Sequence, residues 1–341
     1  MAKLVSSWSK DIKSVPNDYI LPPEQRPQLD IPFCDEFPVI DLSLTDRVYL
    51  ATQIIKALEE FTAFQVINHG IGEKLMEDGM EVSKEFFKLG AEDKEEYVCD
   101  EIRVGKAWVY TGTMNFGTEE KIKSWVDGLV HPCYPVQETI NSWPHKPLRY
   151  REVVAEYAKG SKKVSEKILE LIAEGIGMEK GYFAGNGKLS DGESIIVINH
   201  HPKCPDPSLT IGLKQHNDPT LLTMIQQDNN VYGLQIYKHG KWIAVKPLPN
   251  AFLVLNGQQL EVISNGRLRS GLSRVLTNAE ADQTSISFFV NPDLQSIIEP
   301  AKAVLSDGNP PKFRGFTYWE FIQRFHGELA EGESALSAFQ L

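Results

Sequence analysis

The sequence predicts a mainly β protein with added helices, built around a jelly-roll core. One observation is a series of strand-like segments after Ser194: SIIVINH, LTMIQQ, LQIYKHGKWIAV, AFLVLN, SRVLTN and SISFFVNP. A helical pattern precedes them, and an aromatic-rich helix pattern, FTYWEFIQRF, follows them. Six or more strands over about 100 residues indicate a closed or double-sheet structure. A jelly roll is the commonest way to hide so many strand edges.

The helical pattern occupies residues 37–190 and follows an arm, residues 1–36. The arm is polar and contains LPPEQRPQ, so we expect one short helix lying on the body. Apolar spacing then predicts a strand at 38–42, a helix at 46–61, a strand at 64–68, and helices at 72–89 and about 148–176. We expect these helices to cover one face of the β structure.

The strand region, residues 191–297, is the predicted jelly-roll core. His239 and Gly240 lie between two alternating segments, which is typical of a β-hairpin. Residues 298–341 form a predicted C-terminal helical lid, whose helix at 316–325 packs over one end of the core.

Composition excludes several classes of function. Of the 341 residues, 42% are hydrophobic and 24% charged, as in ordinary soluble globular proteins. A net charge of −11 argues against a nucleic-acid-binding surface. The 4 cysteines form no CxxC pair, and no apolar run has the length of a signal peptide or a membrane span. We therefore expect a cytoplasmic monomer with a small-molecule substrate and no nucleic-acid or membrane partner.

The first candidate for chemistry is the pair His216 and Asp218 in KQHNDPT. Residues two apart on a strand point to the same face, so the imidazole and the carboxylate can converge on one point. Alone, the pair is weak evidence, because hydrogen-bonded surface pairs have the same spacing. Its context is more specific, since PKCPDP precedes it and EVISNGR and SISFFVNP follow it.

With these segments, nearly the whole chain resembles the plant 2-oxoglutarate and iron(II)-dependent dioxygenases. The N-terminal half carries PVIDL, FQVINHG and EFFKLGAEDK, and NSWPHKPLRYREVVAEY is similar to the hyoscyamine hydroxylase branch. The resemblance implies a distorted double-stranded β-helix, with the active site in the mouth of the jelly roll. It also implies that two histidines and one carboxylate bind iron, with His216 and Asp218 as the first two ligands.

The chain departs from the family pattern at both cofactor sites. Ser273, in NGRLRSGLSRV, stands where the family has its second iron-binding histidine. Gln283 replaces the arginine that holds 2-oxoglutarate, and His201, in NHHP, replaces a tyrosine that helps it. Only Ser285 of this clamp is kept, so we expect Ser285 and Gln283 to form a vestigial cosubstrate site. Loss of the arginine alone, at about 1.5–3 kcal/mol, predicts roughly 10- to 150-fold weaker cosubstrate binding.

Three functions are compatible with this altered site. The leading hypothesis is an acid/base reaction without cofactors: an isomerisation, cyclisation, epimerisation or elimination of a small plant metabolite, by analogy an alkaloid. Its catalytic residues would be His216, Asp218 and His201. The second is a residual Fe(II)/2-oxoglutarate hydroxylase, with His216 and Asp218 as metal ligands and His201 as a displaced third ligand. The third is a catalytically inactive small-molecule-binding protein.

A hydrolytic triad of Ser273, His216 and Asp218 is a minor option. The frame implied by the family aims all three side chains at one point, so serine and carboxylate lie on the same side of the imidazole. A working triad needs them on opposite nitrogens.

Four residues are expected to contact the substrate: Ser273, Phe289, Trp125 and Phe321. For Trp125 and Phe321 the alternative is packing within the core and the lid, the commoner role of aromatic side chains. For His201 the alternative is a core imidazole that fills a tyrosine-shaped space and is hydrogen-bonded to Ser285.

Overall fold

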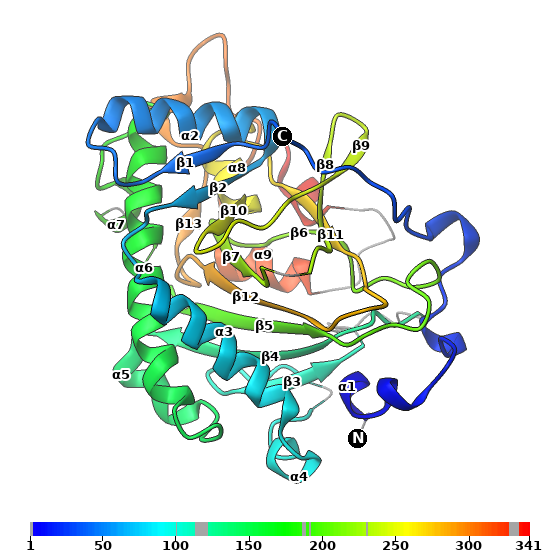
Figure 1. The fold of residues 1–341 in the computed structure, drawn as a ribbon. Coiled ribbons are helices and arrows are strands. Elements are labelled where there is room, and N and C mark those ends of the chain that lie inside the picture. Colours follow the sequence, from blue (N-terminus) through cyan, green and yellow to red (C-terminus); the bar gives the residue numbers. More distant parts are fainter. Residues whose placement is uncertain are drawn as a thin grey trace.

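The structure is a computed structural model that describes residues 3–99, 101–112, 122–185, 189–190, 192–229, 231–326 and 334–341. Two β-sheets form its centre, with long helices along one side (Figure 1). The larger sheet has 8 strands in the order β1-β2-β10-β7-β12-β5-β4-β3, and the smaller has 4 in the order β6-β11-β8-β9. The predicted jelly roll with attached helices is confirmed.

The strands of the larger sheet come from both halves of the chain. They are β1 Val39–Asp41, β2 Ala63–Ile67, β3 Trp108–Thr111, β4 Asp127–Tyr134, β5 Ser194–His201, β7 Leu222–Gln227, β10 Phe252–Asn256 and β12 Gln283–Val290. The smaller sheet consists of β6 Leu213–Asn217, β8 Leu234–Lys238, β9 Lys241–Ala244 and β11 Leu272–Val275. Because β2 pairs with β10, the N-terminal region extends the sheet of the core.

Three long helices pack along the outer face of the larger sheet: α2 Arg47–Phe61, α3 Glu73–Lys88 and α6 Tyr150–Gly175. The Asp46 carboxylate caps α2 by accepting a hydrogen bond from the Tyr49 backbone N–H. After α6 the chain turns at Gly177, whose φ of 82° is readily adopted only by glycine. The shorter helices are α1 Val5–Trp8, α4 Ala91–Lys94, α5 Val136–Thr139, α7 Tyr182–Gly185, α8 Gln258–Ile263 and α9 Tyr318–Phe325.

Residues of the larger sheet alternate between two environments. Apolar side chains such as Ile198, Ile286 and Phe288 point outward and pack in one cluster with the helices. The residues between them point toward the smaller sheet. Pairing of β12 with β5 places Gln283 opposite His201 and Ser285 opposite Asn199, so the polar residues of the predicted cosubstrate site share the inward face.

Strands β3 and β4 were not expected from the sequence. β4 reads DGLVHPCY and is buried along almost its whole length. A strand buried on both faces lacks the alternation of apolar and polar residues that reveals a half-exposed strand. The sequence of β4 therefore shows no alternation by which a strand could be predicted.

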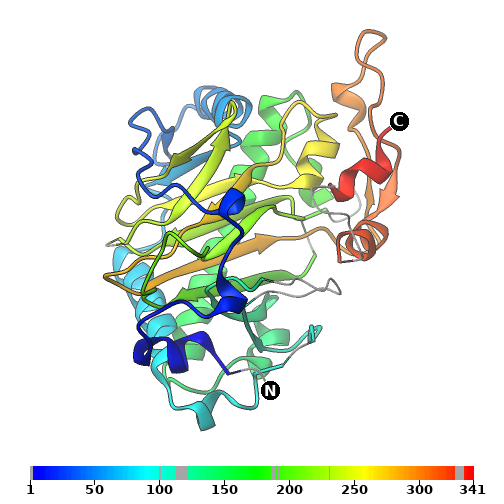
Figure 2. The same cartoon turned by 90° about the vertical axis from the view of Figure 1, so that its right-hand side faces the viewer.

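The N-terminal arm and the C-terminal segment both pack on the β-sheet core. The arm runs across the strands in front of both sheets (Figure 2), and α1 lies within it. Near the C-terminus, β13 Ile297–Ile298 pairs with β14 Phe316–Thr317. The helix expected at 316–325 therefore begins only at Tyr318, because Thr317 is its cap and accepts a hydrogen bond from the Glu320 backbone N–H.

Candidate active site

His216 lies in β6, and Asp218 follows that strand directly. The carbonyl of Lys214 accepts a hydrogen bond from His216 Nδ1 at 2.8 Å. Because a carbonyl only accepts, the neutral imidazole carries its proton on Nδ1 and a lone pair on Nε2. That Nε2 lies 3.6 Å from Asp218 Oδ1. Two acceptors at this distance stabilise a proton or a cation between them.

Ser273 lies directly opposite His216 in the antiparallel pair of β11 and β6. Directly opposed residues have Cβ atoms about 4.5–5.5 Å apart, so Ser273 borders the imidazole. The Asp218 side chain is 6% exposed, whereas that of His216 is 37% exposed. The pair thus consists of a buried carboxylate and an imidazole that a ligand can reach.

These residues do not fit the three-ligand iron site that the resemblance implies. Within the described part of the chain, no group of three His, Cys, Asp or Glu side chains is arranged to hold a metal ion. Ser273 occupies the third corner, and a neutral hydroxyl is a poor ligand for iron. His201 belongs to β5 in the other sheet, and the described residues form no group of three metal-ligating side chains that includes it, so its role as a displaced third ligand stays a prediction.

The minor option of a hydrolytic triad is excluded by the geometry of His216. In such a triad the acid faces one imidazole nitrogen and the serine the other. Here Asp218 faces Nε2, and the Lys214 carbonyl takes Nδ1. No nitrogen remains for Ser273.

His201 stands at the other end of the site, on β5. Its Nδ1 donates a hydrogen bond to the carbonyl of Trp125 at 3.0 Å, and its buried Nε2 has no hydrogen-bond partner. Burial lowers the pKa of His201 to about 4, so the imidazole is neutral near pH 7. The alternative that paired this ring with Ser285 is corrected: the ring is held by a backbone carbonyl, because the Trp125 segment packs against it.

Gln283 lies opposite His201 in the ladder. Its side-chain oxygen is also buried without a hydrogen-bond partner. A Cβ atom placed on Gly233 would come within 2.4 Å of that oxygen, so the glycine makes room for it. Inward positions of β5, β7 and β12 hold no lysine or arginine, and these residues therefore do not fit the clamp for a carboxylate.

Only one of the two adjacent histidines in NHHP faces this interior. His200 points outward, stacks on Phe87 of α3 with ring centroids 4.8 Å apart, and lies 3.0 Å from Thr284 Oγ1. Burial lowers its pKa to about 4. Of these two histidines, only His201 faces the candidate site.

The predicted substrate contacts divide into two groups. Phe289 is half-buried on the inward face, packs against the cluster that contains Trp108 and Val197, and lies four residues after Ser285 on β12. The Trp125 ring is fully buried against the arm and donates from Nε1 to the Pro202 carbonyl at 3.0 Å. Phe321 is fully buried in the aromatic packing of the lid. Trp125 and Phe321 therefore pack within the interior of the protein, as the alternative interpretation expected.

Three neighbours of the site were missed. Tyr110, on β3, lies over Gly128 and donates a hydrogen bond to Asn199 Oδ1. Asp127 is buried and accepts hydrogen bonds from the backbone of the arm. Tyr318 is fully buried, and the nearby Asp218 charge adds to the burial that raises its pKa. Tyr110 and Tyr318 belong to no recognisable sequence motif. Asp127 belongs to the segment WVD at 125–127, which could have pointed to it.

Known proteins are similar to this chain in sequence and in fold. Residues 37–146 match the model for the non-haem dioxygenase in morphine synthesis N-terminal region, and residues 192–292 match that for the 2OG-Fe(II) oxygenase superfamily. Hyoscyamine 6-dioxygenase from Hyoscyamus niger is 40% identical over 100% of this chain and 99% of its own. This chain belongs to the 2OG-Fe(II) oxygenase superfamily.

A further relative and a solved structure agree with this assignment. Flavanone 3-dioxygenase 2 from Oryza sativa subsp. japonica is 34% identical over 96% of this chain and 94% of its own. A crystal structure of JOX2 in complex with 2OG, Fe and JA has a TM-score of 0.89 and 30% identity, covering 100% of this chain and 98% of that one. No helix in the described parts of the chain is long and apolar enough to cross a membrane.

Proposed function

We propose that this member of the 2OG-Fe(II) oxygenase superfamily catalyses a non-oxidative proton transfer on a small molecule. The observation that carries the proposal is Ser273 opposite His216, at the corner where a third metal ligand would be needed. The neutral pair His201 and Gln283 at the cosubstrate end supports it further. The expected reactions are isomerisation, cyclisation, epimerisation and elimination.

His216 is the acid/base group in this proposal. Its Nε2 accepts a proton from a substrate carbon, and Asp218 at 3.6 Å stabilises the imidazolium that results. Return of the proton to another carbon isomerises the substrate. Epimerisation follows when solvent water delivers a proton to the opposite face and His216 loses its proton to solvent. Departure of a leaving group instead completes an elimination.

His201 has a different role from the one expected. A pKa of about 4 makes its imidazole a weak base and no acid near pH 7. Its unpartnered Nε2 can accept a hydrogen bond from the substrate, so we assign His201 to substrate positioning.

The proposed substrate class is supported by one relative. Hyoscyamine 6-dioxygenase acts, by its name, on an alkaloid, and it is 40% identical to this chain. We therefore propose a small specialised metabolite of plants, of the alkaloid type, as the substrate. The proposal includes no cofactor and no macromolecular partner.

A residual Fe(II)/2-oxoglutarate hydroxylase is the second candidate, favoured by the retained His216 and Asp218 geometry. Anaerobic titration with iron(II), with and without 2-oxoglutarate, separates the two candidates. The wild type is expected to bind iron weakly, and Ser273→His/Gln283→Arg to bind it tightly with 2-oxoglutarate. Ser273→Ala/Gln283→Met changes the same positions without adding a ligand and should stay weak. Tight stoichiometric iron in the wild type, strengthened by 2-oxoglutarate, would overturn the proposal.

A further inference from the structure

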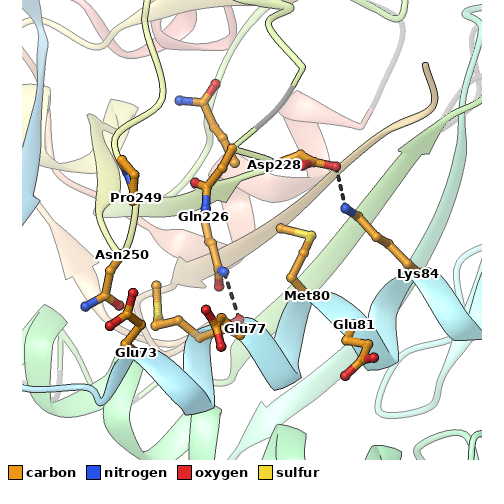
Figure 3. Close-up of a pocket in the computed structure, with 12 residues that line it drawn as sticks. Glu73, Glu77, Met80, Glu81, Lys84, Gln226, Asp228, Pro249 and Asn250 are labelled. Carbon is orange, nitrogen blue, oxygen red and sulfur yellow. Dashed lines mark hydrogen bonds and ion pairs between the residues drawn. The ribbon is translucent and has the colours of Figure 1, made fainter. Parts of the chain in front are cut away.

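A pocket lies outside the jelly roll, between α3 and the end of β7 (Figure 3). Its volume is about 280 Å³, just below the range of pockets that hold drug-sized ligands. Glu73, Glu77 and Glu81 come from α3, while Gln226 and Asn250 come from the sheet side. None of these residues belongs to the site described above.

The α3 side of the pocket carries uncompensated negative charge. Glu73 and Glu77 are exposed, lie one turn apart, and form no ion pair with any residue that the structure describes. Like charges at this spacing destabilise a helix slightly. Glu81 differs, because Arg149 pairs with it. Two carboxylates therefore remain to attract a cation.

The sheet side of the pocket carries acceptors without donors. Gln226 is 8% exposed; its Nε2 donates to the Met76 carbonyl at 2.9 Å, and its Oε1 is buried without a partner. Asn250 Oδ1 is likewise buried without a partner. Figure 3 shows Asn250 beside Glu73, and Gln226 reaching toward α3 near Glu77. A buried acceptor without a partner is costly, so this wall favours a ligand that donates hydrogen bonds.

The only lysine among the described residues that line the pocket is not available to neutralise these groups. Lys84 forms an ion pair with Asp228 at 2.6 Å, and the Asp228 side chain is 6% exposed. Met76 and Met80 are buried and add polarizable apolar surface to the lining. A small cation with both N–H donors and a hydrocarbon part matches this combination of carboxylates, carbonyl oxygens and thioethers.

We propose that this pocket binds a small organic ammonium ion, with Glu73 and Glu77 as counter-charges and Gln226 and Asn250 as hydrogen-bond acceptors. A divalent metal ion fits less well, because the described residues offer no group of three metal-ligating His, Cys, Asp or Glu side chains here. The proposal is independent of the reaction in the jelly roll, because it uses other residues on the opposite side of the larger sheet.

Calorimetric titration of the full-length protein with n-pentylammonium chloride at low ionic strength tests the proposal. We expect saturable binding at one site, weakened about tenfold by Glu77→Gln and abolished by Glu73→Gln/Glu77→Gln. Gln226→Met should weaken it as well. Glu138→Gln, an exposed glutamate on α5, is the matched control and should leave the affinity unchanged. Circular dichroism checks that each variant is folded.

Four results would overturn the proposal. One is the absence of saturable binding by the wild type, and another is equal affinity in Glu73→Gln/Glu77→Gln. The third is a ligand of the wrong class: 1-pentanol binding as tightly as n-pentylammonium would indicate an apolar pocket only. Calcium chloride binding in place of n-pentylammonium would indicate a metal site.

Discussion

The two faces of the larger sheet are built from the same strands but differ in the polarity of the side chains that they bury. On the outer face, Ile198, Ile286 and Phe288 are buried against helices and belong to one apolar cluster. On the inner face, His201 and Gln283 are equally buried, yet each has a polar atom without a hydrogen-bond partner. The outer face therefore supplies stability, and the inner face gives up some stability in order to present unpaired acceptors to a ligand.

The largest effect is expected on the outer face. Phe288 is 0% exposed, so Phe288→Ala removes a fully buried ring and leaves a cavity. We expect the free energy of unfolding to fall by about 3–5 kcal/mol, measured by urea denaturation. Phe289→Ala, its half-buried neighbour on the inner face, is the control and should lose much less. Equal losses in the two variants would remove the distinction between the faces.

The next effect is a dependence of stability on pH that comes from His201. Burial lowers its pKa in the folded protein from 6.5 to about 4, so between these values the unfolded chain binds the proton more readily. Stability is therefore lost as the pH falls from 6.5 toward 4, by about 2 kcal/mol at pH 5 relative to pH 7.5 for this one group.

Urea denaturation of His201→Phe at pH 7.5 and pH 5 measures this contribution. The loss of stability on acidification should be about 2 kcal/mol smaller in the variant than in the wild type. His239→Asn, at an exposed hairpin position, is the control and should lose as much stability between pH 7.5 and pH 5 as the wild type does. An unchanged pH dependence in His201→Phe would mean that the ring is not held neutral by burial.

The smallest effect is expected from Gln283. Gln283→Leu replaces a buried oxygen that has no partner with an apolar group of similar size. The free energy of unfolding should stay the same or rise by about 1 kcal/mol, because no paired acceptor is lost. Thermal denaturation is sensitive enough to detect this change. A loss of 2 kcal/mol or more would show that the oxygen is paired after all.

The same comparison explains what the sequence could predict. Apolar spacing gave α2, α3 and α6 and most core strands, because the helix-covered face follows simple periodicity. Matching motifs placed Ser273 and Gln283 in the site, since an intact frame fixes their positions. The direction of the two adjacent histidines also follows from strand alternation, which sends His200 outward and His201 inward.

Contacts between distant segments were beyond prediction. The hydrogen bond from His201 to the Trp125 carbonyl joins residues 76 positions apart, and no local pattern specifies it. The donation from Tyr110 to Asn199 spans 89 positions. Hydrophobic periodicity encodes which face of an element is buried, but it does not encode which polar atoms meet there.

The anchoring of the arm has a consequence for how the protein is made. The Asp127 carboxylate accepts hydrogen bonds from the backbone N–H groups of Val5 and Ser6, 122 and 121 positions away. Trp8 packs against Trp125, whose carbonyl in turn holds His201. During synthesis the arm leaves the ribosome long before these partners exist. Residues of the arm are thus translated long before they can reach their places, and the packing behind His201 is completed only after Trp125 and Asp127 have been made.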